Sequence, residues 1–140
     1  MRYKEFLKTR PECPFCGHRQ EQIFQQGQAF ITYALAPYTK HHLLVVPNRH
    51  IESIREMTPE EKRDVDALEM KALDILQKLG YHNATFLVRE GKSGDRSIAH
   101  VHFHVIPKIP IGDVEHNDSN RHVLTQEETD ETIRDIQKSL

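Results

Sequence analysis

The sequence has 140 residues, of which 37% are apolar and 29% charged, and its formal net charge at pH 7 is −2. A chain of this length and composition is typical of one compact domain with its own core, so we expect a single domain over residues 1–140. The charge argues against stable nucleic-acid binding, because such binding needs many cationic contacts with phosphates.

Neither end of the chain nor its interior predicts a membrane segment. The stretch "MRYKEFLKTR" at 1–10 is charged throughout, and the longest aliphatic run is "LLVV" at 43–46. A signal peptide or a spanning helix needs a longer apolar segment. We therefore expect a cytoplasmic protein, in which Cys13 and Cys16 are thiols or metal ligands rather than a disulfide.

The first third of the chain predicts three strands. The stretch "EQIFQQGQAFITYALA" indicates strands at 21–25 and 28–34, joined by a turn around Gln26 and Gly27. A further strand covers "HHLLVVP" at 41–47 and ends at its proline, which has no N–H to donate to a neighbouring strand.

Two helices are indicated by capping boxes. In the helix expected at 58–79, Thr58 precedes Glu61 by three residues, so that each side chain can bond the other's backbone N–H. Apolar residues then recur at helical spacing. The C-terminal helix expected at 125–140 starts with the same Thr-x-x-Glu arrangement.

Residues 82–107 predict the remaining strands. One covers 82–90, and the loop 91–97 leads into a second strand with the sequence "AHVHFHVIPK" at 99–108. The polar stretch 108–124 carries no recognisable motif. Strands without long helical crossovers favour an antiparallel sheet. We predict an α+β fold, with about five strands, a long central helix and a C-terminal helix.

Three histidines alternate with apolar residues in the last strand. Successive side chains of a strand point to opposite faces, so His100, His102 and His104 are expected to share one face. Three polar rings on one face leave little for a core, which disfavours an ordinary structural role. Two interpretations remain: a metal site built from imidazoles, and nucleophilic catalysis by one histidine beside an anion-binding neighbour.

The C-x-x-C at Cys13 and Cys16 indicates half of a tetrahedral zinc site. A redox pair is disfavoured because that motif follows a strand, and no strand is predicted before Cys13. Two inert thiols are the remaining alternative. Other histidines are fallback ligands or ordinary surface residues: the first group is His18, His41 and His42, and the second is His82, His116 and His122.

The stretch "HVHFHVI" at 100–106 resembles the signature of the histidine triad (HIT) superfamily, in which three histidines alternate with apolar residues. The segments "HHLLVVPNRHI" and "REGKSGDRSIAH" are also arranged as in its Hint and Fhit branches. The resemblance covers roughly residues 13–107. It implies the HIT fold, a nucleotide substrate and a homodimer.

The resemblance also implies how the histidines act. His102 corresponds to the family's nucleophile, which attacks the α-phosphorus of a nucleotide and forms a nucleotidyl-histidine that water cleaves to a monophosphate. Imidazole is largely neutral at pH 7, so one ring nitrogen is available to attack. The carbonyl of His100 would accept the proton of the other nitrogen.

Further residues are implied to hold the phosphate. His104 would bond its oxygens, and Ser97 matches the Ser or Thr that donates to the phosphate or the leaving group. In the loop before the histidines, Gly94 lets the backbone approach a ligand. The expected substrate-binding residues are therefore Arg89, Lys92, Gly94, Arg96 and His104.

For the cysteines, the resemblance implies two further metal ligands, His50 of the "PNRH" stretch and the first histidine of the triad, His100. Together with Cys13 and Cys16 they complete a four-ligand structural zinc site. No organic cofactor is expected.

Three positions depart from the family pattern. Ala34 stands where the family has a ribose-binding Asp or Asn, and Arg89 and Arg96 replace two amides. The two cations suggest a substrate with more phosphate charge than a simple phosphoramidate. The leading interpretation is a hydrolase of nucleoside phosphoramidates or dinucleoside polyphosphates. The alternatives are a zinc-stabilised nucleotide-binding regulator with little turnover, and a nucleotidyltransferase or phosphorylase, which is disfavoured because that branch usually has Gln at the position of His104.

Overall fold

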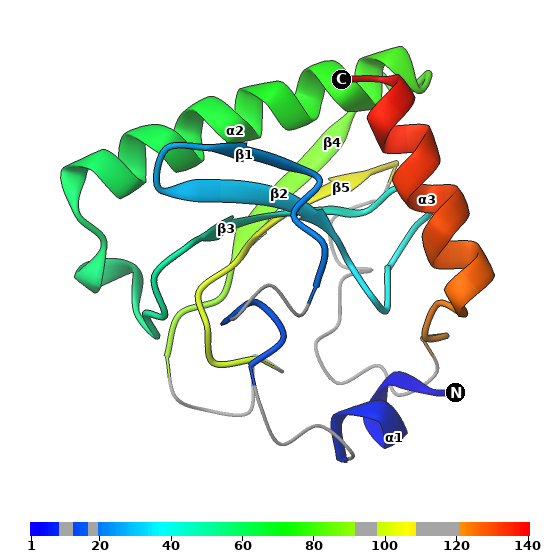
Figure 1. Cartoon of the computed structure of the whole chain (residues 1–140), viewed down its shortest axis with the longest axis horizontal. Helices are drawn as coiled ribbons and strands as arrows, with labels where there is room; N and C mark the ends of the chain where they lie inside the picture. The colour runs from blue at the N-terminus through cyan, green and yellow to red at the C-terminus, as the bar shows by residue number, and fades with distance from the viewer. Residues whose placement is uncertain (9–12, 17–19, 92–97, 109–120) are drawn as a thin grey trace.

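The computed structural model describes residues 1–8, 13–16, 20–91, 98–108 and 121–140 (Figure 1). Its elements in chain order are α1 (Tyr3–Lys8), β1 (Phe24–Gln26), β2 (Ala29–Tyr33), β3 (Leu43–Pro47), the short 3-10 helix η2 (Ile54–Glu56), α2 (Pro59–Lys78), β4 (Ala84–Val88), β5 (Phe103–Pro107) and α3 (Gln126–Lys138).

The strands of the described part form one five-stranded sheet in the order β1-β2-β3-β5-β4. Every neighbouring pair is antiparallel. The predicted α+β class is therefore confirmed. The strand β5 lies between β3 and β4, and Leu44 of β3 pairs with His104 of β5. This pairing brings the third histidine of the row next to the strand that follows His42.

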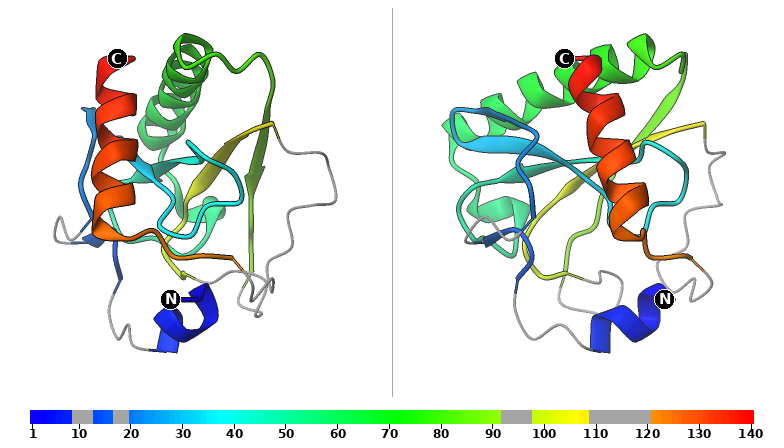
Figure 2. Two further views of the ribbon diagram at one scale, coloured as in Figure 1. Left: turned by 90° about the vertical axis from the view of Figure 1, so that its right-hand side faces the viewer. Right: turned by 45° about the vertical axis from the view of Figure 1, so that its right-hand side comes forward.

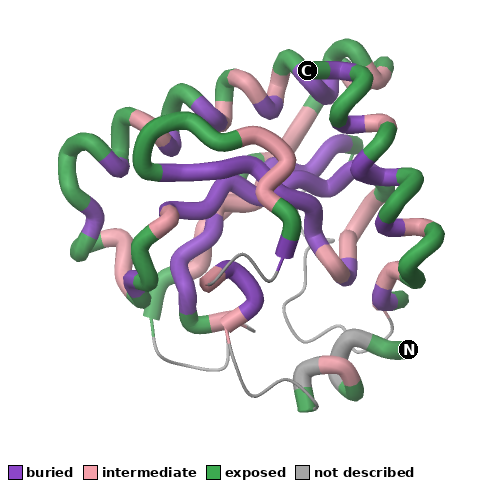
Figure 3. The backbone as a smooth tube through the Cα atoms, in the orientation of Figure 1, coloured by how far each residue is buried: buried purple, intermediate pink, exposed green. Residues whose placement is uncertain are grey.

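The two faces of the sheet have different partners. Helix α2 lies across one face (Figures 1 and 2), where the main core includes Ile31, Val45, Val105, Leu68 and Ile75. A second, smaller cluster on the other face contains Phe15, Phe30, Ala34, Leu44 and Val46. Because both faces are covered, β2 and β3 are buried along their whole length (Figure 3).

Both helix predictions are confirmed. Thr58 and Glu61 form the expected capping box at the start of α2, and Thr125 and Glu128 form the one that precedes α3. Helix α2 stops before Gly80, whose φ of 96° lies in the left-handed region that glycine adopts without strain. Figure 2 shows α3 standing at the end of the sheet, with α1 near its first turn.

Several element boundaries differ from the sequence expectations, and α1 and η2 were not predicted. The expected strand 41–47 begins two residues later, because His41 has a φ of 65°, which no strand residue adopts. The histidine strand begins at Phe103, so the prediction that His100 and His102 lie in it is wrong. Before Phe103 the chain leaves the ladder, and the N–H of Val101 donates to the carbonyl of Ile51 at 2.9 Å.

The remaining strands, expected at 21–25, 28–34 and 82–90, are each shorter than predicted, as β1, β2 and β4 show. Across the described residues, no helix combines the length and the apolar character that crossing a bilayer would require.

Candidate functional site

The histidine row lies on the face of the sheet opposite α2. Val101, Phe103 and Val105 point into the main core or pack against it, so the alternation of faces holds although only the last histidine is in a strand. The rings of His102 and His104 have centroids 4.9 Å apart. His100 and His102 are buried, and His104 is partly exposed.

His100 makes three contacts that fix its orientation. Its Nε2–H donates to the carbonyl of Pro47 at 2.8 Å, and its own carbonyl accepts from Nδ1–H of His102 at 2.7 Å. The Nδ1 atom of His100 therefore carries a lone pair, and it faces the sulfur atoms of the two cysteines. Burial is the main cause that lowers the pKa of His100, which keeps the imidazole neutral.

The hydrogen bond to the carbonyl of His100 also sets the tautomer of His102. Because Nδ1 holds the proton, Nε2 holds the lone pair. A neutral imidazole with a lone pair at Nε2 can attack an electrophile with that atom. The bond is the one that the family resemblance implies.

A fourth histidine joins the row. The backbone N–H of Tyr38 donates to Nδ1 of His42 at 3.2 Å, so the proton of His42 is on Nε2. That atom donates to Nδ1 of His104 at 2.9 Å. His104 must in turn carry its proton on Nε2. A single backbone N–H thus sets the tautomers of two imidazoles, and the second is left with a donor.

Both of these imidazoles are held neutral. Burial is the largest cause that lowers the pKa of His42 to about 3, and the charge of Arg121 adds to it. Burial is also the largest cause that lowers the pKa of His104 well below its ordinary value, and His102, His42 and Arg89 add to it.

His42 was expected only as a fallback metal ligand, and this expectation is wrong, since its ring lies against His104, with centroids 5.1 Å apart, and outside the metal-binding group. The position of His42 follows from the long-range pairing of β3 with β5, and the sequence did not predict which strands pair.

A possible metal-binding group comprises Cys13, Cys16, His50 and His100, whose ligand atoms all lie within 4.8 Å of one another. Sγ of Cys16 is 3.2 Å from Nδ1 of His50, and Sγ of Cys13 is 3.4 Å from Nδ1 of His100. A tetrahedral zinc ion with ordinary bond lengths separates sulfur and nitrogen ligands by about 3.5 Å. The donor set and its spacing therefore fit such an ion, and both cysteines are free thiols.

Phe15, between the two cysteines, links this group to the row. It is 3% exposed, and its ring centroid lies 5.6 Å from that of His100 and 5.4 Å from that of His102. The C-x-x-C segment thus covers one side of both histidines. Sequence reasoning did not assign Phe15 a place.

Other predicted site residues lie elsewhere. Lys92, Gly94, Arg96 and Ser97 are outside the described residues. Arg89 follows β4 directly and lies close enough to His104 for its charge to lower that pKa. Ala34 is buried and its N–H donates to the carbonyl of His42 at 3.0 Å, so its methyl group stands beside the row.

The remaining histidines are not at the site. His41 was a fallback ligand, but its ring bonds Tyr81 and Asp135, which corrects that expectation. His18 and His116 are outside the described residues. His82 is exposed, as is His122, whose Nε2 lies 2.8 Å from a carboxylate oxygen of Glu128.

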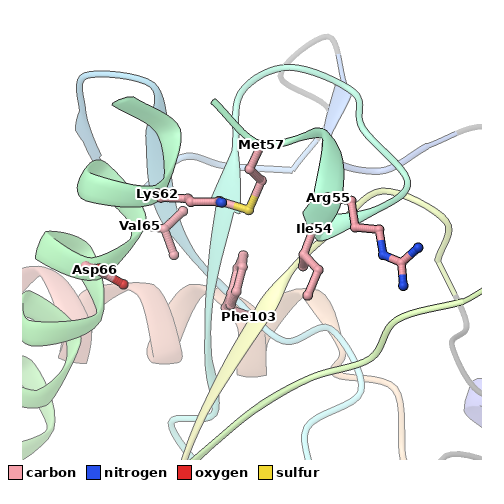
Figure 4. A pocket seen from close by; sticks show the side chains of 7 residues that line it. All are labelled: Ile54, Arg55, Met57, Lys62, Val65, Asp66 and Phe103. Atoms are coloured by element: carbon pink, nitrogen blue, oxygen red, sulfur yellow. The ribbon is translucent and has the colours of Figure 1, made fainter. Parts of the chain in front are cut away.

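Two cavities differ in their relation to the row. One of about 320 Å³ lies between segment 34–42 and α3, and both Ala34 and His42 line it. Another of about 340 Å³ lies on the α2 side of the sheet (Figure 4), where Phe103 and Val65 face it. The second cavity is therefore separated from the histidines by the sheet.

Comparison with known proteins defines the family. Residues 18–111 match the profile described as "HIT domain", which covers more than half of the chain. The chain therefore belongs to the HIT domain family.

Three relatives show the extent of the similarity. The bis(5'-adenosyl)-triphosphatase of Dictyostelium discoideum is 26% identical over 126 residues, which are 89% of this chain and 84% of that protein. The adenosine 5'-monophosphoramidase of Schizosaccharomyces pombe is 34% identical over 74 residues, 53% of each chain. A crystal structure of a Zn-bound histidine triad family protein from Mycobacterium smegmatis has a TM-score of 0.65 at 19% identity, covering 96% of this chain and 88% of that chain.

Proposed function

We propose that this chain acts as a single HIT domain that hydrolyses nucleoside phosphoramidates or dinucleoside polyphosphates at the α-phosphate. The observation that carries the proposal is the hydrogen bond from Nδ1–H of His102 to the carbonyl of His100, which leaves the lone pair on Nε2. The names of the relatives from Dictyostelium and Schizosaccharomyces pombe support both substrate classes.

The reaction has two steps. Nε2 of His102 attacks the α-phosphorus, and the bond from phosphorus to the leaving group breaks as the new phosphorus–nitrogen bond forms. The leaving group departs with the bonding electron pair and takes a proton from solvent where it needs one, and Ser97 is the proposed hydrogen-bond donor to it. Water then attacks the same phosphorus and loses a proton to solvent, the phosphorus–nitrogen bond breaks with its electron pair returning to Nε2, and nucleoside monophosphate leaves.

The phosphate needs donors that are in place before charge develops on it. His104 fits this task, because the bond from His42 forces its proton onto Nε2. Arg89, whose charge helps to lower the pKa of His104, would place a permanently charged guanidinium near the phosphate. We propose that Lys92, Gly94 and Arg96 of the following loop complete the binding site.

The metal is proposed to be zinc with a structural role. Four protein ligands leave no open position for a substrate, and a closed Cys2His2 set is typical of structural zinc. His100 would serve both parts of the molecule, since its Nδ1 faces the cysteines while its carbonyl holds His102. The ion would thereby fix Phe15 and the nucleophile in one arrangement.

Turnover of α-phosphate-labelled diadenosine polyphosphate and adenosine phosphoramidate tests the activity. We expect labelled monophosphate from the wild-type protein and none from His102→Ala. The exposed residue His82 provides the matched control, and His82→Ala should keep the full rate. Equal nucleotide binding by wild type and His102→Ala, with no product from either, would instead indicate a binding regulator.

Elemental analysis of protein purified without added metal tests the ion. We expect about one zinc per chain, because the four donors form one tetrahedral set. Cys13→Ser should remove most of it and lower the melting temperature, since a structural ion contributes to folding. A ratio far below one in the wild type, unchanged by the substitution, would contradict the site.

Assembly and location are also proposals. We propose a homodimer, as the family resemblance implies, and a cytoplasmic location, as expected from the lack of a long apolar segment in the sequence. Within the described residues β4 is an edge strand of the sheet and its Phe86 is 41% exposed, so we propose this edge as the dimer contact.

A further inference from the structure

The segment 47–51, at the end of β3 and just beyond it, contacts both histidines of the metal-binding group. It contains His50, whose ring meets that of His100 edge to face, with centroids 4.9 Å apart. The carbonyl of Pro47 accepts from Nε2–H of His100 at 2.8 Å, and the carbonyl of Ile51 accepts from the backbone N–H of the next residue at 2.9 Å. The segment thus supplies one ligand and orients the other.

Arg49 ties the middle of this segment to the start of α2. Its Nη2 donates to the carbonyl of Glu56 at 2.7 Å and to Oε1 of Glu61 at 2.8 Å. The same oxygen accepts from the N–H of Thr58 at 2.9 Å in the capping box. Glu61 is 3% exposed, and a buried carboxylate needs such partners to remain charged. The guanidinium of Arg49 is therefore held at one place against α2.

The helix gives this contact a fixed reference point. Val65 and Leu68, on the turns after Glu61, are buried in the main core, so packing sets the position of α2. His50, in contrast, is exposed and lies where the chain has no regular secondary structure. A ligand in such a segment is placed less precisely than one on a helix or strand. Arg49, directly before His50, joins it to the helix.

We propose that Arg49 is a positioning residue for the metal site. Its bonds to Glu61 and to the carbonyl of Glu56 set the direction in which His50 faces the ion. They also hold the carbonyl that orients His100. Groups that orient metal ligands change the affinity for the metal by about 10- to 100-fold when they are removed. This inference rests on the proposed metal site and is independent of the proposed hydrolysis.

The zinc affinity of the full chain, measured by competition with a chromogenic chelator, tests this role. We expect Arg49→Met to bind zinc at least about tenfold more weakly than the wild type. Arg49→Lys keeps a cationic donor and should recover most of the affinity. Arg63 is an exposed arginine of α2 with an ion pair to Glu60 at 3.7 Å, and Arg63→Met should bind zinc as the wild type does.

Two further variants separate the position of His50 from stability. Arg49→Met leaves the buried carboxylate of Glu61 without its cation, which lowers stability by itself. The double variant Arg49→Met, Glu61→Gln removes that charge, and glutamine still fits the capping box. It should melt near the wild-type temperature yet bind zinc as weakly as Arg49→Met. Thr58→Ala should lower the melting temperature of the metal-free chain but change the zinc affinity less than about twofold.

Cobalt(II) in place of zinc reports the geometry of the site through its visible absorption. We expect the tetrahedral bands of the wild type to weaken in Arg49→Met and in the double variant, and to stay unchanged in Thr58→Ala.

The outcomes separate the proposals. Wild-type zinc affinity and cobalt bands in the double variant would overturn the role of Arg49 alone. An equal loss of affinity in Thr58→Ala would also overturn it, because stability would then control the affinity. A wild-type chain that binds neither metal overturns the metal site and this inference together, whereas the turnover assay decides on the hydrolysis separately.

Discussion

Two neighbouring histidines, His41 and His42, have opposite surroundings. His41 has a left-handed backbone conformation and its ring bonds the hydroxyl of Tyr81 at 2.8 Å and the carboxylate of Asp135 at 2.7 Å. It thereby ties the start of β3 to the segment after α2 and to α3. His42 points to the other side, where it bonds His104.

The difference shows that the partner, and not the residue type, determines what a histidine does. The ring of His41 has a carboxylate on one side and a phenol on the other, which makes it a link between elements. The ring of His42 accepts from a backbone N–H on one side and donates to another imidazole on the other. The first bond fixes the tautomer of His42, and the second then fixes that of His104. We expect substitutions of the two residues to change different properties.

Removal of the donor of His42 should have the larger effect on rate. In His42→Phe nothing holds the proton of His104 on Nε2, so the phosphate loses an oriented donor. We expect kcat to fall about 10²-fold, the size typical for loss of one donor to a developing charge. In His42→Gln the side-chain amide can still donate, and part of the rate should return. A kcat of His42→Phe within a factor of two of the wild type would contradict the assignment.

Substitution of His41 should instead lower stability. Asparagine tolerates the left-handed conformation, so His41→Asn isolates the loss of the two side-chain hydrogen bonds. We expect the free energy of unfolding to fall by about 2 kcal/mol in urea denaturation, with kcat changed less than twofold. If kcat fell as far as in His42→Phe while stability stayed the same, the distinction between the two residues would be lost.

The pH dependence of stability should show an effect that belongs to His42. The pKa of this buried imidazole is lowered from 6.5 to about 3, so the unfolded chain binds one proton more between these values. Stability therefore decreases as the pH falls from about 6.5 toward 3, with a slope from this residue of up to about 1.4 kcal/mol per pH unit. In His42→Gln this part of the slope should be missing, whereas an unchanged slope would show that His42 is not buried as a neutral group.

The sequence predicted those features that depend on local patterns. The capping boxes at Thr58 and Thr125 gave both long helices, because the bonds involved span three residues. The four residues of the metal-binding group were also expected, through the family resemblance. The start of β5 was not predicted, since the ladder ends at Phe103, opposite Val88, the last residue of β4, and no local pattern marks that point.

Two parts of the site escaped the sequence for the same reason. His42 reaches His104 only because β3 and β5 pair in one register, and Arg121, in a segment without a motif, contacts Tyr38, which lies 83 positions earlier in the sequence. Such contacts depend on how distant segments fold together. A single sequence does not reveal that arrangement.

The most direct test of the account is a reaction with α-phosphate-labelled diadenosine polyphosphate, stopped with an alkaline denaturant on the time scale of the first turnover. If Nε2 of His102 is the nucleophile, label should appear on the protein before it appears in monophosphate, at no more than one equivalent per chain. The protein-bound label should be stable in alkali and released by acid, as is typical of a phosphorus–nitrogen bond. His102→Ala should give no labelled protein. Free monophosphate from the wild type without any labelled protein, or label that persists in His102→Ala, would contradict the covalent mechanism.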